Sequence, residues 1–276
     1  MEKKFEKVTF RKRLKSMWKV DARRMLVSPF FYIMVGISFV VPILILVMTT
    51  MMDGMPTTDP QTGLPGEPMK GFDFVWQILG AVSGGAVQQP SADQAAMSMD
   101  LVSMCNINMM FFAVAVLVCI FIADDFRSGY AKNLFTVRAK KTDYVISKTL
   151  VCFLGSACMF IAFFVGSVIG GGVAGLPFTM DGFNGLNLVL CMLSKICLIP
   201  VFVSIFTLMS VIAKQKAWLS ICLSLGVGML LFMMIPMLTP LNASLVHVLG
   251  CLAGSVLFAF GLGAISNLIL KKTSLV

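Results

Sequence analysis

Six stretches of mostly apolar residues alternate with polar segments along the chain. They cover residues 30–52, 101–123, 149–176, 186–213, 218–238 and 243–270. About 20 apolar residues in a helix cross the hydrocarbon core of a bilayer, which is roughly 30 Å thick. The pattern therefore predicts an all-α integral membrane protein, with a six-span transmembrane domain over residues 30–276.

The polar residues that precede the first span, residues 1–29, have the period of an amphipathic helix. Apolar side chains recur at helical spacing from Phe10 to Leu26, with basic side chains largely between them. Such a helix is suited to lie in the membrane interface. Nucleic-acid binding is not expected for this segment, since a span follows directly after Pro29. The residues expected to form the membrane-surface helix are Arg11, Leu14, Trp18, Arg23 and Arg24.

The distribution of basic residues predicts the orientation of the spans. Of the 22 Lys and Arg, 20 lie in residues 1–29, residues 124–148, the turn at Lys214 and the C-terminal tail. The loop of residues 53–100, in contrast, holds six acids and one basic residue, Lys70. Cytoplasmic loops carry the excess of Lys and Arg. We therefore expect both termini and residues 124–148 in the cytoplasm, and residues 53–100 outside.

Composition excludes a soluble protein, because 58% of the residues are hydrophobic and only 13% are charged, where soluble domains have about 25% charged. The eight cysteines lie in or beside the spans without a CxxC pair, so we interpret them as packing residues. Gly170–Gly172 fits close helix packing in lipid. The sequence has one histidine and no GxxxxGK[ST] run, so no catalytic site, metal site or ATPase motif is expected in this chain.

Lys195 is a charged residue well inside a predicted span. Such a position costs roughly 2.5–3.5 kcal/mol on insertion scales and often marks a functional site. One interpretation is a lysine that reaches the outer interface or bonds to nearby backbone. The other is a residue of the translocation path or of a dimer interface.

Residues 124–148, DDFRSGYAKNLFTVRAKKTDYVISK, form the one long polar segment between spans that is rich in Lys and Arg. Phe126, Tyr130 and Leu134 recur every four residues, which predicts one face of a short helix. Gly129 is expected to bend or break that helix near its start. The segment is either a helix that docks on a partner protein or on lipid headgroups, or a solvated loop.

This segment and the layout around it resemble the permeases of the type-2 ATP-binding cassette family. The resemblance rests on Asp125–Tyr130, Asn133–Arg138 and Tyr144–Lys148, with Asp125 and Tyr130 where the family usually has Glu and Thr. It implies a permease half that pairs with an identical or related permease and docks on a separate P-loop ATPase, which holds the ATP and Mg. The implied coupling residues are Asp125, Phe126, Arg127, Gly129, Tyr130, Asn133, Leu134 and Arg138.

The resemblance therefore predicts the permease subunit of an ATP-driven exporter, located in the plasma membrane of a bacterial cell. The alternative is a secondary transporter or channel that needs no ATPase. That class predicts acids within the spans or an inverted repeat, and the sequence has neither. Neither the transported substrate nor the identity of the second permease follows from the sequence.

Overall fold

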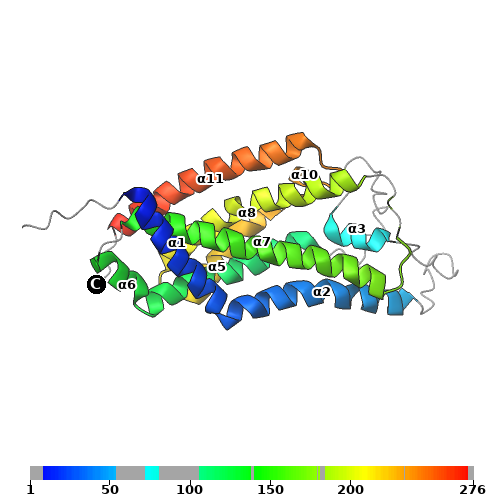
Figure 1. Ribbon diagram of the computed structural model, residues 1–276, viewed down its shortest axis with the longest axis horizontal. Coiled ribbons are helices and arrows are strands. Elements are labelled where there is room, and N and C mark those ends of the chain that lie inside the picture. The colour runs from blue at the N-terminus through cyan, green and yellow to red at the C-terminus, as the bar shows by residue number, and fades with distance from the viewer. Residues whose placement is uncertain are drawn as a thin grey trace, which may run out of the picture.

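The computed structural model describes residues 9–53, 72–80, 106–137, 140–178, 180, 184–232 and 234–272. Its helices lie lengthwise as an elongated bundle (Figure 1). Five helices in these ranges are long and apolar enough to cross a membrane. They are α2 (Pro29–Asp53), α5 (Met110–Arg127, preceded by the 3-10 turn η1, Ile107–Met109), α7 (Lys141–Val173), α8 (Gly185–Ala213) and α11 (Leu245–Lys272). The predicted class of all-α membrane protein is confirmed.

The fifth predicted span, residues 218–238, is divided into two helices. α9 (Ala217–Phe232) has 16 residues and α10 (Ile235–Leu238) has four. At 1.5 Å per residue α9 is about 24 Å long, which is less than the roughly 30 Å of the hydrocarbon core. Pro236 lies in the first turn of α10, where its missing N–H costs no helical hydrogen bond. The predicted count of six crossings therefore depends on α9 and α10 together.

The helices on either side of the predicted connector extend beyond the apolar residues. α5 continues to Arg127, and α7 begins at Lys141, eight residues before the predicted start of its span. With 33 residues α7 is about 50 Å long, some 20 Å more than the hydrocarbon core. The predicted connector of residues 124–148 thus contains the end of α5, the short helix α6 (Tyr130–Val137) and the start of α7.

Glycines on α7 allow α2 and α3 (Asp73–Leu79) to pack against it. A Cβ at Gly166 would lie 2.3 Å from the carbonyl oxygen of Phe39, and one at Gly170 would lie 2.9 Å from Cα of Ile43. A Cβ at Gly171 would meet Val75 at 2.6 Å. Gly170 and Gly171 thus fulfil the packing role predicted for the glycine run, whereas Gly172 has no neighbour within 4 Å. The apolar part of the 53–100 segment that the structure describes, α3, packs inside the bundle.

α8 occupies the centre of the bundle and is the most enclosed of the long helices. It packs against α5, α7, α9 and α11. Phe111 of α5 contacts Phe160 of α7 and Phe202 of α8, with ring centroids 4.8 and 4.4 Å apart. α11 lies at the periphery, with most of its apolar side chains exposed.

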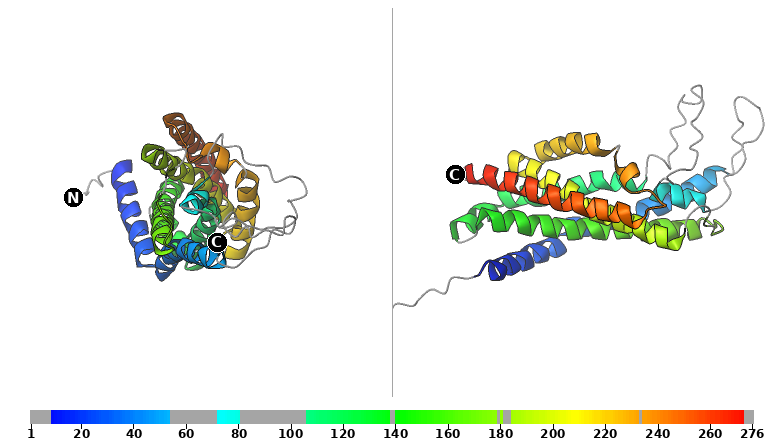
Figure 2. Two further views of the ribbon diagram at one scale, coloured as in Figure 1. Left: turned by 90° about the vertical axis from the view of Figure 1, so that its right-hand side faces the viewer. Right: turned by 90° about the horizontal axis from the view of Figure 1, so that it is seen from above.

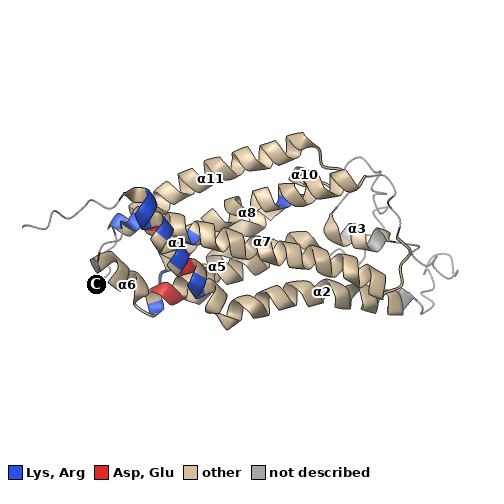
Figure 3. Cartoon of the chain, viewed as in Figure 1, with Lys and Arg blue, Asp and Glu red and all other residues tan. Residues whose placement is uncertain are grey.

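α1 (Phe10–Val27) confirms the helix predicted before the first span. It packs across α7 and lies at the edge of the bundle when that is viewed along its length (Figure 2). Only Ser28, in extended conformation, separates α1 from Pro29 at the start of α2. Basic residues gather at the end of the bundle formed by α1, α6, the start of α7 and the end of α11 (Figure 3).

Candidate functional site

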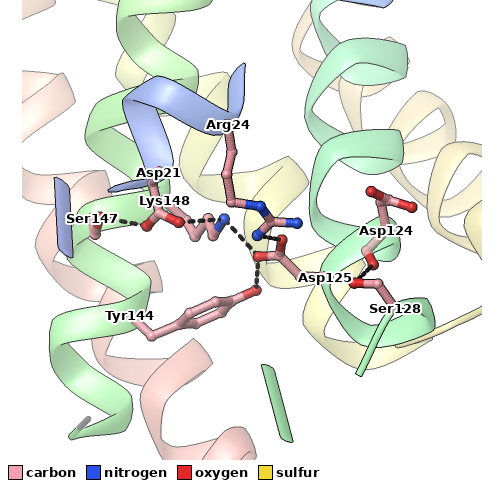
Figure 4. Close-up of polar contacts among 8 residues, drawn as sticks. All are labelled: Asp21, Arg24, Asp124, Asp125, Ser128, Tyr144, Ser147 and Lys148. Carbon is pink, nitrogen blue, oxygen red and sulfur yellow. Dashed lines mark hydrogen bonds and ion pairs between the residues drawn. The ribbon is translucent and has the colours of Figure 1, made fainter. Parts of the chain in front are cut away.

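Six polar side chains from α1, α5 and α7 meet at the basic end of the bundle (Figure 4). We call this group the charge cluster, and its members are Asp21, Arg24, Asp125, Tyr144, Ser147 and Lys148. Lys148 is at its centre, with Nζ 2.8 Å from Oδ1 of Asp21 and 2.6 Å from Oδ2 of Asp125. All three of these side chains are fully buried. The ammonium group of α7 therefore joins a carboxylate of α1 to a carboxylate of α5.

The remaining carboxylate oxygens of the charge cluster have partners as well. Arg24 Nη1 donates to Oδ1 of Asp125 at 2.5 Å, and the Tyr144 hydroxyl donates to Oδ2 at 2.9 Å. The Ser147 hydroxyl donates to Oδ2 of Asp21 at 2.6 Å. Two carboxylates thus face one ammonium and one guanidinium, so the group is electrically neutral. Buried charges are tolerated when they are paired in this way, and here Lys148 Nζ contacts its two carboxylates as ion pairs without hydrogen-bond geometry.

Helical spacing places these side chains on the correct faces. Met17, Asp21 and Met25 are four residues apart on α1, and all three are buried against the bundle. Tyr144 and Lys148 are likewise four residues apart on α7. Gly155 of α7 leaves room for Met25, because a Cβ there would lie 2.6 Å from the methionine sulfur. The close approach of α1 to α7 brings Asp21 within reach of Lys148.

The charge cluster reaches α6 through Arg24. The guanidinium carbon lies 4.0 Å from the centroid of the Tyr130 ring, at the first residue of α6. Burial by itself would lower the pKa of Arg24, but the charge and hydrogen bond of Asp125, together with Tyr130 and Asp21, outweigh it and the pKa is raised. Burial, together with the charge of Asp21, raises the pKa of Tyr130. Arg24 therefore stays charged and Tyr130 neutral at physiological pH, as a cation–π contact requires.

Two further contacts fasten the start of α7 to its neighbours. Arg13 Nε of α1 donates to Oδ2 of Asp143 at 3.1 Å. The Lys141 ammonium donates to the carbonyl oxygen of Leu270, near the end of α11. The segments at the basic end of the bundle are therefore joined by charged side chains, which complement the apolar packing between the helices.

The break between α5 and α6 falls at Ser128 and Gly129. Gly129 has φ of +72°, in the left-handed region that favours glycine. The predicted break is therefore found. Phe126, however, lies on α5, where its ring packs 6.4 Å from that of Tyr144. The predicted single helical face of Phe126, Tyr130 and Leu134 is wrong, because the glycine ends one helix before the next begins.

The residues predicted to couple to an ATPase have different surroundings. Asp125 and Phe126 are buried within the bundle, and Tyr130 and Leu134 are half-buried. Arg127 and Asn133 are exposed, as are Lys132 and Thr136 on the same helix as Asn133. Arg138 lies outside the described residues. Only part of the predicted set is therefore available to a partner protein.

The residues predicted for the membrane-surface helix also divide into two groups. Arg11, Trp18 and Arg23 are exposed, and Leu14 is half-buried. Arg24 points inward to Asp125. α1 thus has one face toward the protein and another toward its surroundings.

Sequence reasoning assigned no role to Asp21, Tyr144, Ser147 or Lys148 beyond the resemblance of residues 144–148. The sequence does contain a signal for Asp21, since it is an acid spaced four residues from Met17 and from Met25 on an otherwise apolar face. The corresponding signal for Lys148 is weaker, because a lysine just before an apolar span is also what the positive-inside pattern predicts.

Lys195 lies on α8, away from the charge cluster, and its side chain is fully buried. Its Nζ donates to Oδ1 of Asn108 at 2.8 Å and to Oγ1 of Thr239 at 2.9 Å, and the Thr239 carbonyl oxygen is 3.4 Å away. It therefore does not extend to the membrane surface. Instead it connects η1, α8 and the residue after α10 through neutral acceptors.

This arrangement predicts an order of effects for substitutions at Lys195. Lys195→Met leaves acceptors of Asn108 and Thr239 without a donor, at about 1–3 kcal/mol per buried group, but also removes the cost of burying an ammonium. Lys195→Glu places a carboxylate against the same acceptors and should destabilise the protein more. Denaturant titration in mixed micelles measures both variants. Equal stability of the two would contradict the contacts described here.

The described residues include no group of three or more His, Cys, Asp or Glu that could hold a metal. The charge cluster can transmit movement from one helix to another. Ion pairs buried in an apolar surrounding hold helix ends in a fixed relation, so displacement of one helix end is passed to the others.

The sequence model of the ABC-2 family transporter protein matches residues 25–233, which cover α2 to α9 and the last residues of α1. The chain therefore belongs to the ABC-2 family of transporter membrane proteins, as the resemblance implied. Members of this family are permeases of ATP-binding cassette transporters, so an ATPase partner is implied. No curated protein and no solved structure matches the chain.

Proposed function

We propose that this chain is the permease subunit of an ATP-driven exporter and that α6 couples it to a separate ATPase, which binds the ATP and Mg. The observation that carries the proposal is the contact of Tyr130, at the start of α6, with Arg24 of the charge cluster. A short helix with an exposed polar side is thereby attached to a buried group of charges that joins three other helices.

The proposed orientation follows from the charges. The end that bears α1, α6 and the start of α7 faces the cytoplasm of a bacterial cell, where the ATPase is, and the chain lies in the plasma membrane. α9 and α10 together complete a sixth crossing, so both termini are cytoplasmic. Two permeases, identical or related, pair to enclose the path.

In the proposed mechanism, α6 is the moving part. Its exposed side, with Arg127 just before it, contacts the ATPase. Movement of α6 displaces Tyr130 and with it Arg24, which is bonded to Asp125 at the end of α5. Because Lys148 ties Asp125 to Asp21, the ends of α5, α7 and α1 move together. Asp125 and Phe126 act in this scheme from inside the bundle, as a support for α6.

Docking and coupling can be separated experimentally. We expect Lys132→Glu combined with Asn133→Ala, on the exposed side of α6, to reduce the amount of ATPase that co-purifies with the tagged chain from its source cells. Tyr130→Ala should instead retain the ATPase. Hydrolysis of ATP by the bound ATPase should, however, no longer be coupled to transport through the variant chain. Mass spectrometry identifies the partner, and phosphate release measures hydrolysis.

Lys214→Glu, on the exposed turn between α8 and α9, is the matched control and should behave as the wild type. Retention of the ATPase by the α6 double variant would move the docking surface away from α6. If no ATPase co-purified with the wild-type chain, the proposed coupling would be excluded.

A further inference from the structure

α1 carries a row of basic side chains on the side that faces away from the bundle. Lys12, Lys15, Lys19 and Arg23 are three, four and four residues apart, so they share one face of the helix. All four are exposed, and none has a hydrogen bond or ion pair to another described residue. We call these four residues the basic stripe.

The basic stripe lies nearly opposite the face of α1 that the protein uses. With about 100° per residue, Lys19 is some 200° around the helix from Met17. Met17, Asp21 and Met25 face α7, and Arg13 and Arg24 are bound to Asp143 and Asp125. The charges of α1 are therefore divided: those beside the inner face neutralise acids of the protein, and those on the outer face have no acid to neutralise.

The surroundings of the basic stripe are those of a membrane interface. Trp18, Leu26 and Val27 are 38, 55 and 71% exposed. α1 lies at the edge of the bundle (Figure 2), and one residue separates it from α2, which is apolar enough to cross the membrane. A helix with basic side chains and exposed Trp and Leu, held at the start of a span, has the chemistry of a surface-lying segment that meets lipid headgroups.

We propose that the basic stripe binds the phosphate groups of anionic phospholipids in the leaflet around α1. Four cations without protein partners provide the charge complementarity, and Trp18 and Leu26 provide the apolar contact with the acyl-chain boundary. An acidic protein would match the charges but would leave these apolar side chains without a suitable environment. The lipid holds α1 from outside, while Asp21 and Arg24 hold it from inside.

Trp18 provides a direct probe of this contact. The chain has three tryptophans, so Trp76→Phe with Trp218→Phe leaves Trp18 as the sole one. The protein is reconstituted in phosphatidylcholine vesicles that contain a fixed fraction of phosphatidylglycerol. Bromine, which quenches tryptophan fluorescence, is carried either by the phosphatidylglycerol or by an equal amount of the phosphatidylcholine. We expect the brominated phosphatidylglycerol to quench Trp18 about twofold more than the brominated phosphatidylcholine.

In the protein with Trp18 as its sole tryptophan, we change all four residues of the basic stripe to Gln: Lys12, Lys15, Lys19 and Arg23. The two brominated lipids should then quench Trp18 equally. Lys214→Gln with Lys216→Gln, on the exposed turn between α8 and α9, should leave the difference intact. Equal quenching in the protein with an intact stripe, or an unchanged difference in the Gln variant, would overturn the proposal.

A second measurement avoids the tryptophan substitutions, because Trp76 is buried. Lipid retained by the purified chain is quantified by mass spectrometry, and the four Gln substitutions should reduce phosphatidylglycerol but not phosphatidylcholine. An equal loss of both lipids would count against specific binding by the stripe. Both assays use the chain expressed alone in a host without its ATPase, so these results are independent of the proposed coupling through α6.

Discussion

Replacement of Lys148 by methionine is expected to lower the free energy of unfolding by about 3–5 kcal/mol, because it leaves buried charge without its partner. The carboxylates of Asp21 and Asp125 would lose the ammonium 2.8 and 2.6 Å away, and both side chains are fully buried. Asp21 would keep only the Ser147 hydroxyl, and Asp125 would keep Arg24 and Tyr144. Denaturant titration in mixed micelles measures the loss.

Two further variants separate charge from packing in this experiment. Adding Asp21→Asn to Lys148→Met removes the carboxylate that is left with the fewest partners, so part of the lost stability should return. Lys132→Met, at an exposed position of α6, should have the stability of the wild type within about 0.5 kcal/mol. If Lys148→Met were as stable as the wild type, the charge cluster would not hold α1, α5 and α7 together.

Gly166→Ala is expected to destabilise the contact between α2 and α7 by about 1–3 kcal/mol or more, because the added Cβ has no space. It would lie 2.3 Å from the carbonyl oxygen of Phe39 and 3.1 Å from Cγ of Pro42. The first of these atoms belongs to backbone, so a change of side-chain rotamer does not relieve the overlap. The same titration measures the loss.

Gly172→Ala is the control on the same helix, since a Cβ there has no neighbour within 4 Å. Alanine favours helix over glycine, so this variant should be as stable as the wild type or slightly more so. A similar loss of stability in both variants would point to a general effect of substitutions in α7 and would contradict the packing described for Gly166.

Two apolar stretches of the sequence agree closely with long helices. The stretches 30–52 and 186–213 lie within α2 and α8 and differ from them by at most one residue at either end. α7 begins eight residues before the apolar stretch 149–176, and its first turns contain buried polar side chains, Asp143, Tyr144 and Lys148 among them. Hydropathy detects contact with lipid, and it does not detect a helix whose polar residues are neutralised by other helices.

Of the coupling residues predicted from the resemblance, only Asp125 is a member of the charge cluster. Asp125 and Tyr130 were expected at a surface where a partner docks. In the structure, Asp125 is buried and bonded to Arg24, while the half-buried Tyr130 contacts the guanidinium group of Arg24. The pairing could not be deduced from spacing, since Arg24 and Asp125 are 101 residues apart. A single sequence does not indicate which distant charges meet.

The composition of the charge cluster has a consequence for the order of assembly during synthesis. Asp21 is made more than a hundred residues before Ser147, its hydrogen-bond partner, and Lys148 follows Ser147 directly. Until α7 is made, the Asp21 carboxylate on the apolar face of α1 lacks the ammonium group of Lys148, although Arg24 lies three residues away on the same helix. We therefore expect α1 to reach its final place only after the third of the long helices has been inserted. In a chain truncated before Lys148, the Asp21 carboxylate would lack its lysine partner. A quality-control protease could distinguish such a chain from the finished protein by this group.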